Sequence, residues 1–422
     1  MSTSRRRFLL GSAAALAAAG LPLGLAHGQA RPGDSKFIFV FARGGWDPTR
    51  VFATEFDNRN VDMEPGADRA TAGNISYVDH PSRPSVRGFM DQYHGQTAIL
   101  NGVMVRSIAH EICTMIAMTG NSSGTVPDWP AILASQAQDR YTLPHLVLDG
   151  PSFPGNLGSA VARTGTNGQL ESLLSGASLD NSDIPVQGFS RPMEGIMDRY
   201  LARRSSARAD GATSTLDERL ARDFATSHSK ATTLKDLQFV MSFNGGQQLA
   251  GQANVAVQAL SLGLSRCVTL QHLGQGGQGW DTHANNDELQ TGHFEDLFAG
   301  LSSLMRLLQV TPGEVEPTLA DETTVVVLSE MGRTPKLNAF NGKDHWPYTS
   351  VLIHGPRITG SRVIGGFDAN YYGDPVDPTT ADSTPQGQIL SAEAVGATLL
   401  AMADIDPDPY VSGVQPITGL LT

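Results

Sequence analysis

Cysteine is scarce in this chain of 422 residues, which contains only Cys113 and Cys267. A scaffold held together by several disulfides is therefore excluded. A single bridge between the two cysteines and a pair of buried free thiols both agree with the sequence. Internal repeats and long low-complexity tracts are also lacking. The length is sufficient for a large core, either in one domain or in a domain with an insertion.

Basic residues are outnumbered, with 30 Lys and Arg against 42 Asp and Glu and a formal net charge of −12. Such a chain repels nucleic acids and anionic membrane surfaces, so we expect no nucleic-acid partner. The same charge disfavours anionic substrates in general. An anionic substrate would therefore need a local positive site.

Long apolar runs are missing beyond the N-terminus, where none approaches the roughly 20 residues of a transmembrane helix. Residues 4–8 (Ser-Arg-Arg-Arg-Phe) match the twin-arginine export pattern, and an Ala-rich stretch and a small-residue cleavage site at 28–30 follow. Because Ala and Gly make this stretch a weak membrane span, we interpret residues 1–30 as a signal peptide and not as a stable anchor. We expect export by the twin-arginine translocase, to the periplasm or beyond, which favours a folded cargo with a metal or cofactor.

Strand-like apolar runs alternate with helical stretches in the remainder. Residues 36–41 (Lys-Phe-Ile-Phe-Val-Phe) and 323–328 (Thr-Thr-Val-Val-Val-Leu) predict strands that are buried on both faces. This alternation predicts a mostly parallel sheet with helices on both faces. Further strands are expected near 97–100, 146–148, 267–271 and 350–354, and helices near 110–118, 128–133, 191–209, 215–264, 286–308 and 392–403.

Residues 150–190 differ in character, being rich in Gly, Ser, Asn and Pro, and the two helical stretches up to residue 264 follow them. We therefore predict an α/β domain at 31–422 that carries a mainly helical insertion at 150–264. We expect this insertion to shape the substrate pocket.

Acid and imidazole side chains recur where the predicted strands end, which is where open α/β sheets bind ligands. Asp47 follows the first strand, although an aspartate before Pro48 is also ordinary turn chemistry. Asp281 and His283 follow a Gly-rich loop at 274–279. Residues two apart in an extended segment point the same way, so these two can share one ion. The alternative is a surface loop in which Asp281 caps the next helix.

Glu330 ends a Val-rich strand, where a carboxylate is costly unless it is paired, hydrogen-bonded or metal-bound. The alternative to metal binding is a salt bridge between Glu330 and Arg333. The pair at 344–345 (Asp-His) precedes another strand, although His345 could also be a histidine packed in the core. His110 opens a helix, and its alternative is a helix N-terminal histidine without a role in the site. Together these residues predict a divalent metal site. The predicted ligands are Asp47, Asp281, His283, Glu330, Asp344 and His345, the predicted catalytic residues are His110 and Arg333, and the metal is zinc or manganese, as one or two ions.

The motifs also resemble those of a bacterial family called domain of unknown function 1501, from about residue 36 to the C-terminus. The resemblance is carried by Gly-Gly-x-Asp after the first strand and by three later blocks, which are 279–283 (Gly-Trp-Asp-Thr-His), 329–335 (Ser-Glu-Met-Gly-Arg-Thr-Pro) and 342–347 (Gly-Lys-Asp-His-Trp-Pro). It implies the alkaline phosphatase and sulfatase superfamily. The implied fold is a three-layer α/β/α sandwich with a metal site at the strand ends.

The resemblance also implies roles for single residues. Asp47, Asp281, His283, Glu330 and His345 fall at metal-ligand positions. His110 falls at the position of the nucleophile, where the superfamily has Ser, Thr or a cysteine-derived group. Met331 replaces the histidine of an Asp-His-Gly motif, and its thioether is a poor ligand for a hard ion. These two departures weaken the second of the two metal positions.

Two classes of function follow. The first is a metal-dependent hydrolase of phosphate or sulfate esters, with a small-molecule or polymeric substrate. His110 would be its nucleophile, a ligand or a general acid, and Arg333 or Arg106 would clamp the anion. The second is a non-catalytic binding or assembly protein that retains the fold. A phosphomutase or transferase, suggested by residues 342–346 alone, is a third alternative.

Overall fold

The computed structural model describes residues 35–165, 169–171, 190–237 and 242–422. The predicted signal peptide at 1–30 lies outside these ranges and stays a prediction. Within them, no helix combines the length and the apolar character needed to cross a bilayer.

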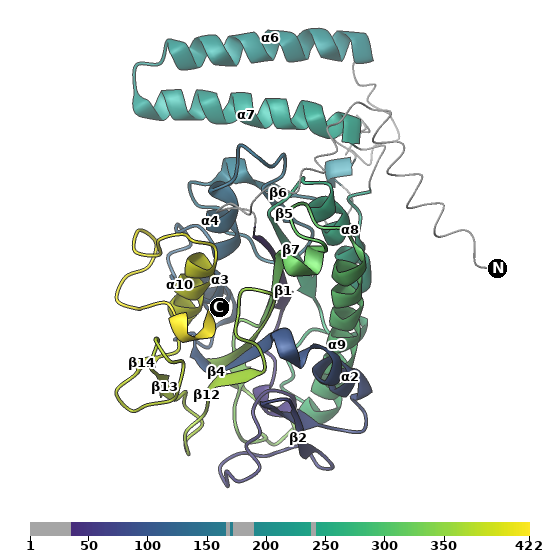
Figure 1. The fold of residues 1–422 in the computed structure, drawn as a ribbon, viewed down its shortest axis with the longest axis vertical. Coiled ribbons are helices and arrows are strands. Elements are labelled where there is room, and N and C mark those ends of the chain that lie inside the picture. Colours follow the sequence, from purple (N-terminus) through teal and green to yellow (C-terminus); the bar gives the residue numbers. More distant parts are fainter. Residues whose placement is uncertain (1–34, 166–168, 172–189, 238–241) are drawn as a thin grey trace, which may run out of the picture.

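An eight-stranded sheet with the order β12-β4-β11-β8-β1-β7-β5-β6 forms the centre of the molecule (Figure 1). Strand β11 runs antiparallel to β4 and β8, and the other neighbouring pairs are parallel. The mostly parallel sheet is thus confirmed. The strand bounds are β1 Lys36–Ala42, β4 Thr97–Met104, β5 His145–Val147, β6 Val161–Arg163, β7 Cys267–His272, β8 Thr323–Leu328, β11 Tyr348–His354 and β12 Arg362–Gly365.

Helices cover both faces of this sheet (Figure 1). Along β1, Ile38 and Val40 join one core, whereas Phe37 and Phe39 join the other. This alternation is what a strand with period two requires when both of its faces are buried. The structure therefore confirms the three-layer α/β/α sandwich. The first core is covered by α2 (Pro84–Tyr93), α8 (Leu249–Ser261) and α9 (Asn286–Val310), and the second by α3 (His110–Thr119), α4 (Trp129–Ser135) and α10 (Ala392–Met402).

A two-stranded antiparallel ribbon lies in a polar part of the chain for which we predicted no strand. It consists of β2 (Asp68–Ala72) and β3 (Ile75–Asp79). Short pairs also form between β9 (Gly332–Arg333) and β10 (His345–Trp346), and between β13 (Pro375–Val376) and β14 (Gln388–Ile389).

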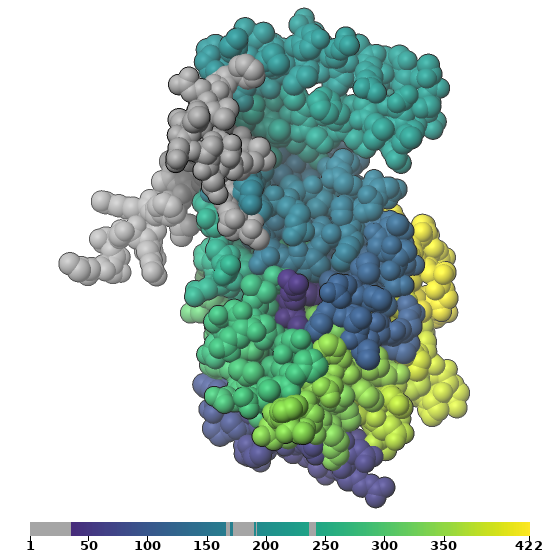
Figure 2. Space-filling model, turned by 180° about the vertical axis from the view of Figure 1, so that it is seen from behind, coloured from purple at the N-terminus to yellow at the C-terminus, as the bar shows by residue number. Residues whose placement is uncertain are grey.

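Helices α6 (Arg191–Asp210) and α7 (Thr215–Leu237) form an antiparallel hairpin beyond the β6 edge of the sheet (Figures 1 and 2). Helix α7 lies along residues 138–142, which enter β5 at its amino end. Most of the predicted site residues instead follow the carboxyl ends of β1, β7 and β8. The hairpin thus lies away from them, and the expectation that the 150–264 stretch shapes the pocket stays a prediction, because parts of this stretch lie outside the described residues. Within 150–264, β6 joins the sheet and α8 packs on it, and the boundaries of a separate cap stay a prediction.

Both cysteines are buried free thiols. Burial raises the pKa of Cys113 to about 11 and that of Cys267 to about 12. The free-thiol alternative therefore holds, and neither thiol is an activated nucleophile.

Candidate metal centre

Five of the predicted site residues converge from four segments at the carboxyl edge of the sheet. Asp281 and His283 lie in the loop after β7, Glu330 follows β8, His345 opens β10, and His110 begins α3. The loop after β1 passes beside them. Gly44 and Gly45 have φ of +126° and +83°, and a Cβ on Gly44 would lie 2.7 Å from the backbone nitrogens of residues 280 and 281. Glycine is needed here because the two loops are in backbone contact.

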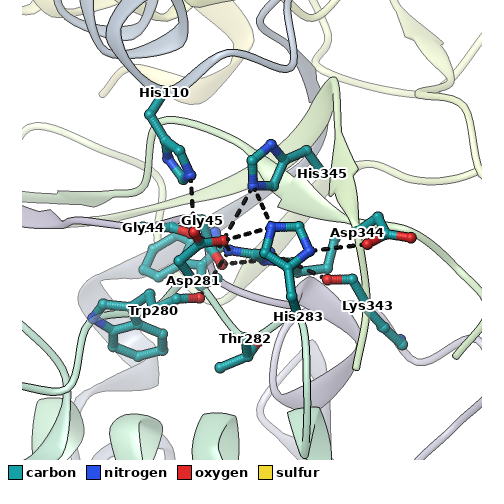
Figure 3. Close-up of polar contacts among 12 residues, drawn as sticks. Gly44, Gly45, His110, Trp280, Asp281, Thr282, His283, Lys343, Asp344 and His345 are labelled. Carbon is teal, nitrogen blue, oxygen red and sulfur yellow. Dashed lines mark hydrogen bonds and ion pairs between the residues drawn. The ribbon is translucent and has the colours of Figure 1, made fainter. Parts of the chain in front are cut away.

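Three imidazoles share one arrangement, in which Nδ1 faces an oxygen acceptor and Nε2 points into the site. Figure 3 shows this for His283, which lies between Asp344 and Asp281. An Nδ1–H hydrogen bond of this kind fixes the ring and prepares Nε2 to bind a metal. The Nδ1 atoms of His110, His283 and His345 lie 2.8, 2.9 and 2.7 Å from Glu330 Oε1, Asp344 Oδ1 and the carbonyl oxygen of Ile108, respectively.

The three Nε2 atoms gather around the carboxylate of Asp281 (Figure 3). Those of His283 and His345 each lie 3.1 Å from Oδ1 and 3.0 Å from each other. The Nε2 atom of His110 lies 3.4 Å from Oδ2. Ligands about 2.0–2.1 Å from a tetrahedral zinc ion stand roughly 3.3 Å apart. One carboxylate oxygen and two imidazole nitrogens at these separations fit a divalent ion, with His110 beside them.

Asp281 is the charged centre of this group. Although burial alone raises the pKa of this carboxyl, hydrogen bonds from His110 and Arg333 hold it well below its usual range, so Asp281 is ionised. The same network raises the pKa of His110 to about 9, through its hydrogen bonds to Asp281 and Glu330. In the absence of an ion, His110 is thus an imidazolium between two carboxylates. Because a ligand nitrogen must be deprotonated, binding of a metal to His110 would release this proton.

Arg333 positions Asp281 from behind. Its guanidinium is fully buried, donates to Asp281 Oδ1 at 2.7 Å, and donates to the backbone carbonyl oxygens of Gly45 and Trp280 at 2.8 and 3.0 Å. These contacts tie the loops after β1, β7 and β8 together. The other candidate for an anion clamp, Arg106, pairs with Glu393.

The cluster opens to solvent on the side of Asp281 and His283, whose side chains are 45% and 47% exposed, whereas Glu330 is 1% exposed. Glu330 also accepts hydrogen bonds from the backbone N–H of Gly44. Glu330 and Asp344, which we predicted as ligands, thus each lie behind a histidine. Asp281 and His283 lie at the open face, with His345 beside them, and the Nε2 atom of His110 is buried on their inner side.

Asp47 is placed outside the cluster, although we predicted it as a ligand. Its buried carboxylate lies 2.9 Å from Lys343 Nζ, and it accepts hydrogen bonds from Thr49 at 2.7 Å and from Asn286 at 2.8 Å. Although burial alone raises the pKa of Asp47, Lys343 and Arg50 hold it well below its usual range. The ammonium group of Lys343 thus stands where a second cation beside Asp47 would be.

Lys343 was missed as a partner of Asp47, although it lies two residues before His345 in a block that we singled out. Its pairing joins residues almost 300 positions apart and has no local sequence signal. Met331 is fully buried in the core.

Comparison with protein-family models shows a match to the family described as "Protein of unknown function (DUF1501)" over residues 34–384. None of the curated proteins matches the chain. Solved structures of low similarity include the phosphonate monoester hydrolase SpPMH from Silicibacter pomeroyi, at 11% identity and a TM-score of 0.39, covering 92% of this chain and 77% of that one. A second is the phosphonate monoester hydrolase of Agrobacterium radiobacter, at 12% identity and a TM-score of 0.34, covering 90% of this chain and 78% of that one. A third comes from work on the metabolism of multiple glycosaminoglycans by Bacteroides thetaiotaomicron. It is 9% identical, with a TM-score of 0.42, and the match covers 90% of this chain and 74% of that one. The family match spans most of the chain, which therefore belongs to the DUF1501 family of proteins of unknown function.

Proposed function

We propose that this protein is an exported hydrolase of phosphate or sulfate esters that depends on one divalent metal ion, zinc or manganese. The observation that carries the proposal is the convergence of three imidazole Nε2 atoms on Asp281, with each Nδ1 held by an oxygen. A set of nitrogen and carboxylate donors suits zinc and manganese alike. The choice of ester rests on the motif resemblance to the phosphatase and sulfatase superfamily.

Asp281, His283 and His345 would hold the ion. When bound, a divalent ion of this kind polarises the ester oxygen and lowers the pKa of bound water to near neutrality. Asp344 and the carbonyl of Ile108 keep the two ligand imidazoles in orientation. Arg333 fixes the Asp281 carboxylate and is a positioning residue.

His110 is the proposed general acid. It stands on the other oxygen of Asp281, at 3.4 Å, and Glu330 orients its ring through Nδ1. From there it can deliver the Nε2 proton to the leaving-group oxygen of an ester bound at the open face. A positioned general acid contributes typically about 10²–10⁴-fold to a rate.

The test is a screen of the metal-loaded protein against aryl phosphate, aryl phosphodiester and aryl sulfate esters. We expect hydrolysis of at least one class, its loss in Asp281→Asn and with chelator, and a fall of about 10²-fold or more in kcat for His110→Gln. Activity that persists in both variants would contradict this mechanism.

The alternative function, a non-catalytic binding or assembly protein, is favoured by one observation. Lys343 pairs with Asp47, so a second ion at that carboxylate is disfavoured. A protein that binds metal through Asp281 and His283 but hydrolyses none of the three ester classes would support this alternative.

Export by the twin-arginine translocase is part of the proposal and rests on residues 4–8. Replacing Arg5 and Arg6 by Lys should keep the protein in the cytoplasm, as measured by cell fractionation. Unchanged export of this variant would contradict the assignment.

A further inference from the structure

Arg43 is an exposed cation at the edge of the candidate metal centre. It follows β1, and it is the one exposed residue in the otherwise buried run 36–53. Its guanidinium has no hydrogen bond or ion pair with any described residue. A free cation thus stands at the end of a central strand, where open α/β sheets bind their ligands.

The backbone of Arg43 is held on both sides. Its N–H donates to the carbonyl oxygen of His272 at 3.3 Å, which continues the pairing of β1 with β7, and its carbonyl oxygen accepts from the N–H of Trp280 at 3.1 Å. The next residue, Gly44, lies against the backbone of Asp281 (Figure 3). The side chain of Arg43 therefore starts from a fixed point, one residue from the contact between the two loops.

One carboxylate connects this point with His110. The two oxygens of Glu330 accept hydrogen bonds from the N–H of Gly44 at 2.9 and 3.1 Å, and the first of them lies 2.8 Å from Nδ1 of His110. The peptide group that joins Arg43 to Gly44 and the proposed general acid thus contact the same carboxylate. The long side chain of Arg43 therefore begins within reach of an ester that contacts His110.

The strand pattern places Arg43 on the side of the sheet that α3 covers. Phe37, Phe39 and Phe41 of β1 pack in the core beneath α3, and side chains two residues apart in a strand point to the same face. Arg43 continues this series, because its N–H still pairs with β7. It lies beyond the core and is open to solvent, at the end of the sheet where α3 begins with His110.

The two arginines that we predicted as anion clamps are already engaged. Arg333 is fully buried and holds Asp281, and Arg106 pairs with Glu393. The chain as a whole is acidic, so an anionic ester needs a local positive group. Arg43 provides such a group, and no carboxylate of the described residues neutralises it.

We propose that Arg43 binds the phosphate or sulfate oxygens of the ester at the candidate metal centre. This inference rests on the proposed function and names the residue that recognises the acid part of the substrate. A guanidinium presents paired N–H donors in one plane, which match two oxygens of a phosphate or sulfate group. Arg43 thereby favours charged oxyanion esters over uncharged esters.

The test is calorimetric titration of the zinc-loaded protein with inorganic phosphate and, separately, with inorganic sulfate, which distinguishes the two acids. Arg43→Met should raise the dissociation constant of the anion that wild type binds by about 10- to 100-fold, the effect of losing a hydrogen bond between charged groups. Arg43→Lys should lie between the two, because an ammonium keeps the charge but not the paired donors. Arg219→Met, at an exposed arginine on α7, is the matched control and should bind as wild type.

The zinc content distinguishes the loss of anion binding from the loss of the site. Arg43→Met should retain the zinc content of wild type in elemental analysis, because the side chain of Arg43 contacts none of the proposed ligands. A wild type that binds neither anion, an Arg43→Met variant with the affinity of wild type, or one that loses its zinc would overturn the inference.

The titration needs no turnover, so its failure differs from a failure of the proposed function. A wild type that binds phosphate or sulfate through Arg43 but hydrolyses no ester would contradict the hydrolase alone. Ester hydrolysis with the same KM in Arg43→Met and in wild type would contradict the role of Arg43 alone.

Discussion

Asp344 shows how much of the site lies outside its open face. It is largely exposed, yet it holds His283 through Nδ1 at 2.9 Å. Removing such a partner typically costs 10–100-fold in metal affinity. Asp344→Asn should therefore weaken zinc binding by that factor in calorimetric titration of the apoprotein. The exposed carboxylate of Asp91 on α2 gives the matched control, and Asp91→Asn should bind as wild type. Equal affinity of both variants would contradict the orienting role of Asp344.

Lys343 makes a prediction about stability at the same scale. It is fully buried with Asp47, so Lys343→Met leaves a buried carboxylate with only Arg50 as a charged neighbour. Breaking a buried ion pair costs roughly 3–5 kcal/mol. We expect urea unfolding to show a loss of this order, and the double variant Asp47→Asn/Lys343→Met should recover part of it. A loss below about 1 kcal/mol in the free energy of unfolding would mean that Lys343 is not the partner on which Asp47 depends.

The sequence indicated most of this site because its residues lie in recognisable loops at predicted strand ends. Asp281, His283 and His345 are brought together as the motif positions suggested. Which acid contacts which base could not be predicted, because it depends on loops meeting through space. Glu330 and Asp344 lie behind histidines, and Asp47 has Lys343 as its partner.

Among the secondary-structure elements, the strands with clear apolar runs were predictable. Strands β1 and β8 were expected at 36–41 and 323–328 and begin and end within a residue of these bounds. The ribbon of β2 and β3 was not predicted, since most of β2 is polar and exposed. Helix propensity also extended one predicted helix across 215–264, where the structure has α7 and α8 as separate helices.

The elements of the core hold three histidines whose burial has a consequence for pH. Burial lowers the pKa of His145 in β5 to about 3 and the pKa values of His293 in α9 and His354 in β11 to about 4. Unfolded histidines titrate near 6.5. Below that pH, the unfolded chain binds protons that the folded chain does not.

Stability contributed by these histidines is thus complete above about pH 6.5 and is lost as the pH falls toward 4, by up to roughly 1.4 kcal/mol per pH unit for each residue. Urea midpoints at pH 7.5, 6 and 5 should decrease in that order. His145→Gln should make the decrease shallower. Midpoints independent of pH in wild type would contradict the neutral, buried state of these rings.

For the whole molecule, an ion bound to the folded chain adds to its stability by mass action. At a free concentration one hundred times Kd, the gain is about 2.7 kcal/mol. Thermal unfolding should therefore move to higher temperature when zinc or manganese is added to the apoprotein, and chelator should reverse this. The Asp281→Asn variant should show little shift. An equal shift in that variant would locate the ion elsewhere.

The central claim, that His283, His345 and Asp281 hold a divalent ion, is tested most directly by the metal content of the purified protein. Elemental analysis should find about one zinc or manganese ion per chain in wild type and in the control His94→Ala, whose histidine lies outside the site. The double variant His283→Ala/His345→Ala should retain less than about a tenth of that. A wild-type protein without a bound divalent ion after incubation with zinc and manganese, or a double variant with the same content as wild type, would contradict the account.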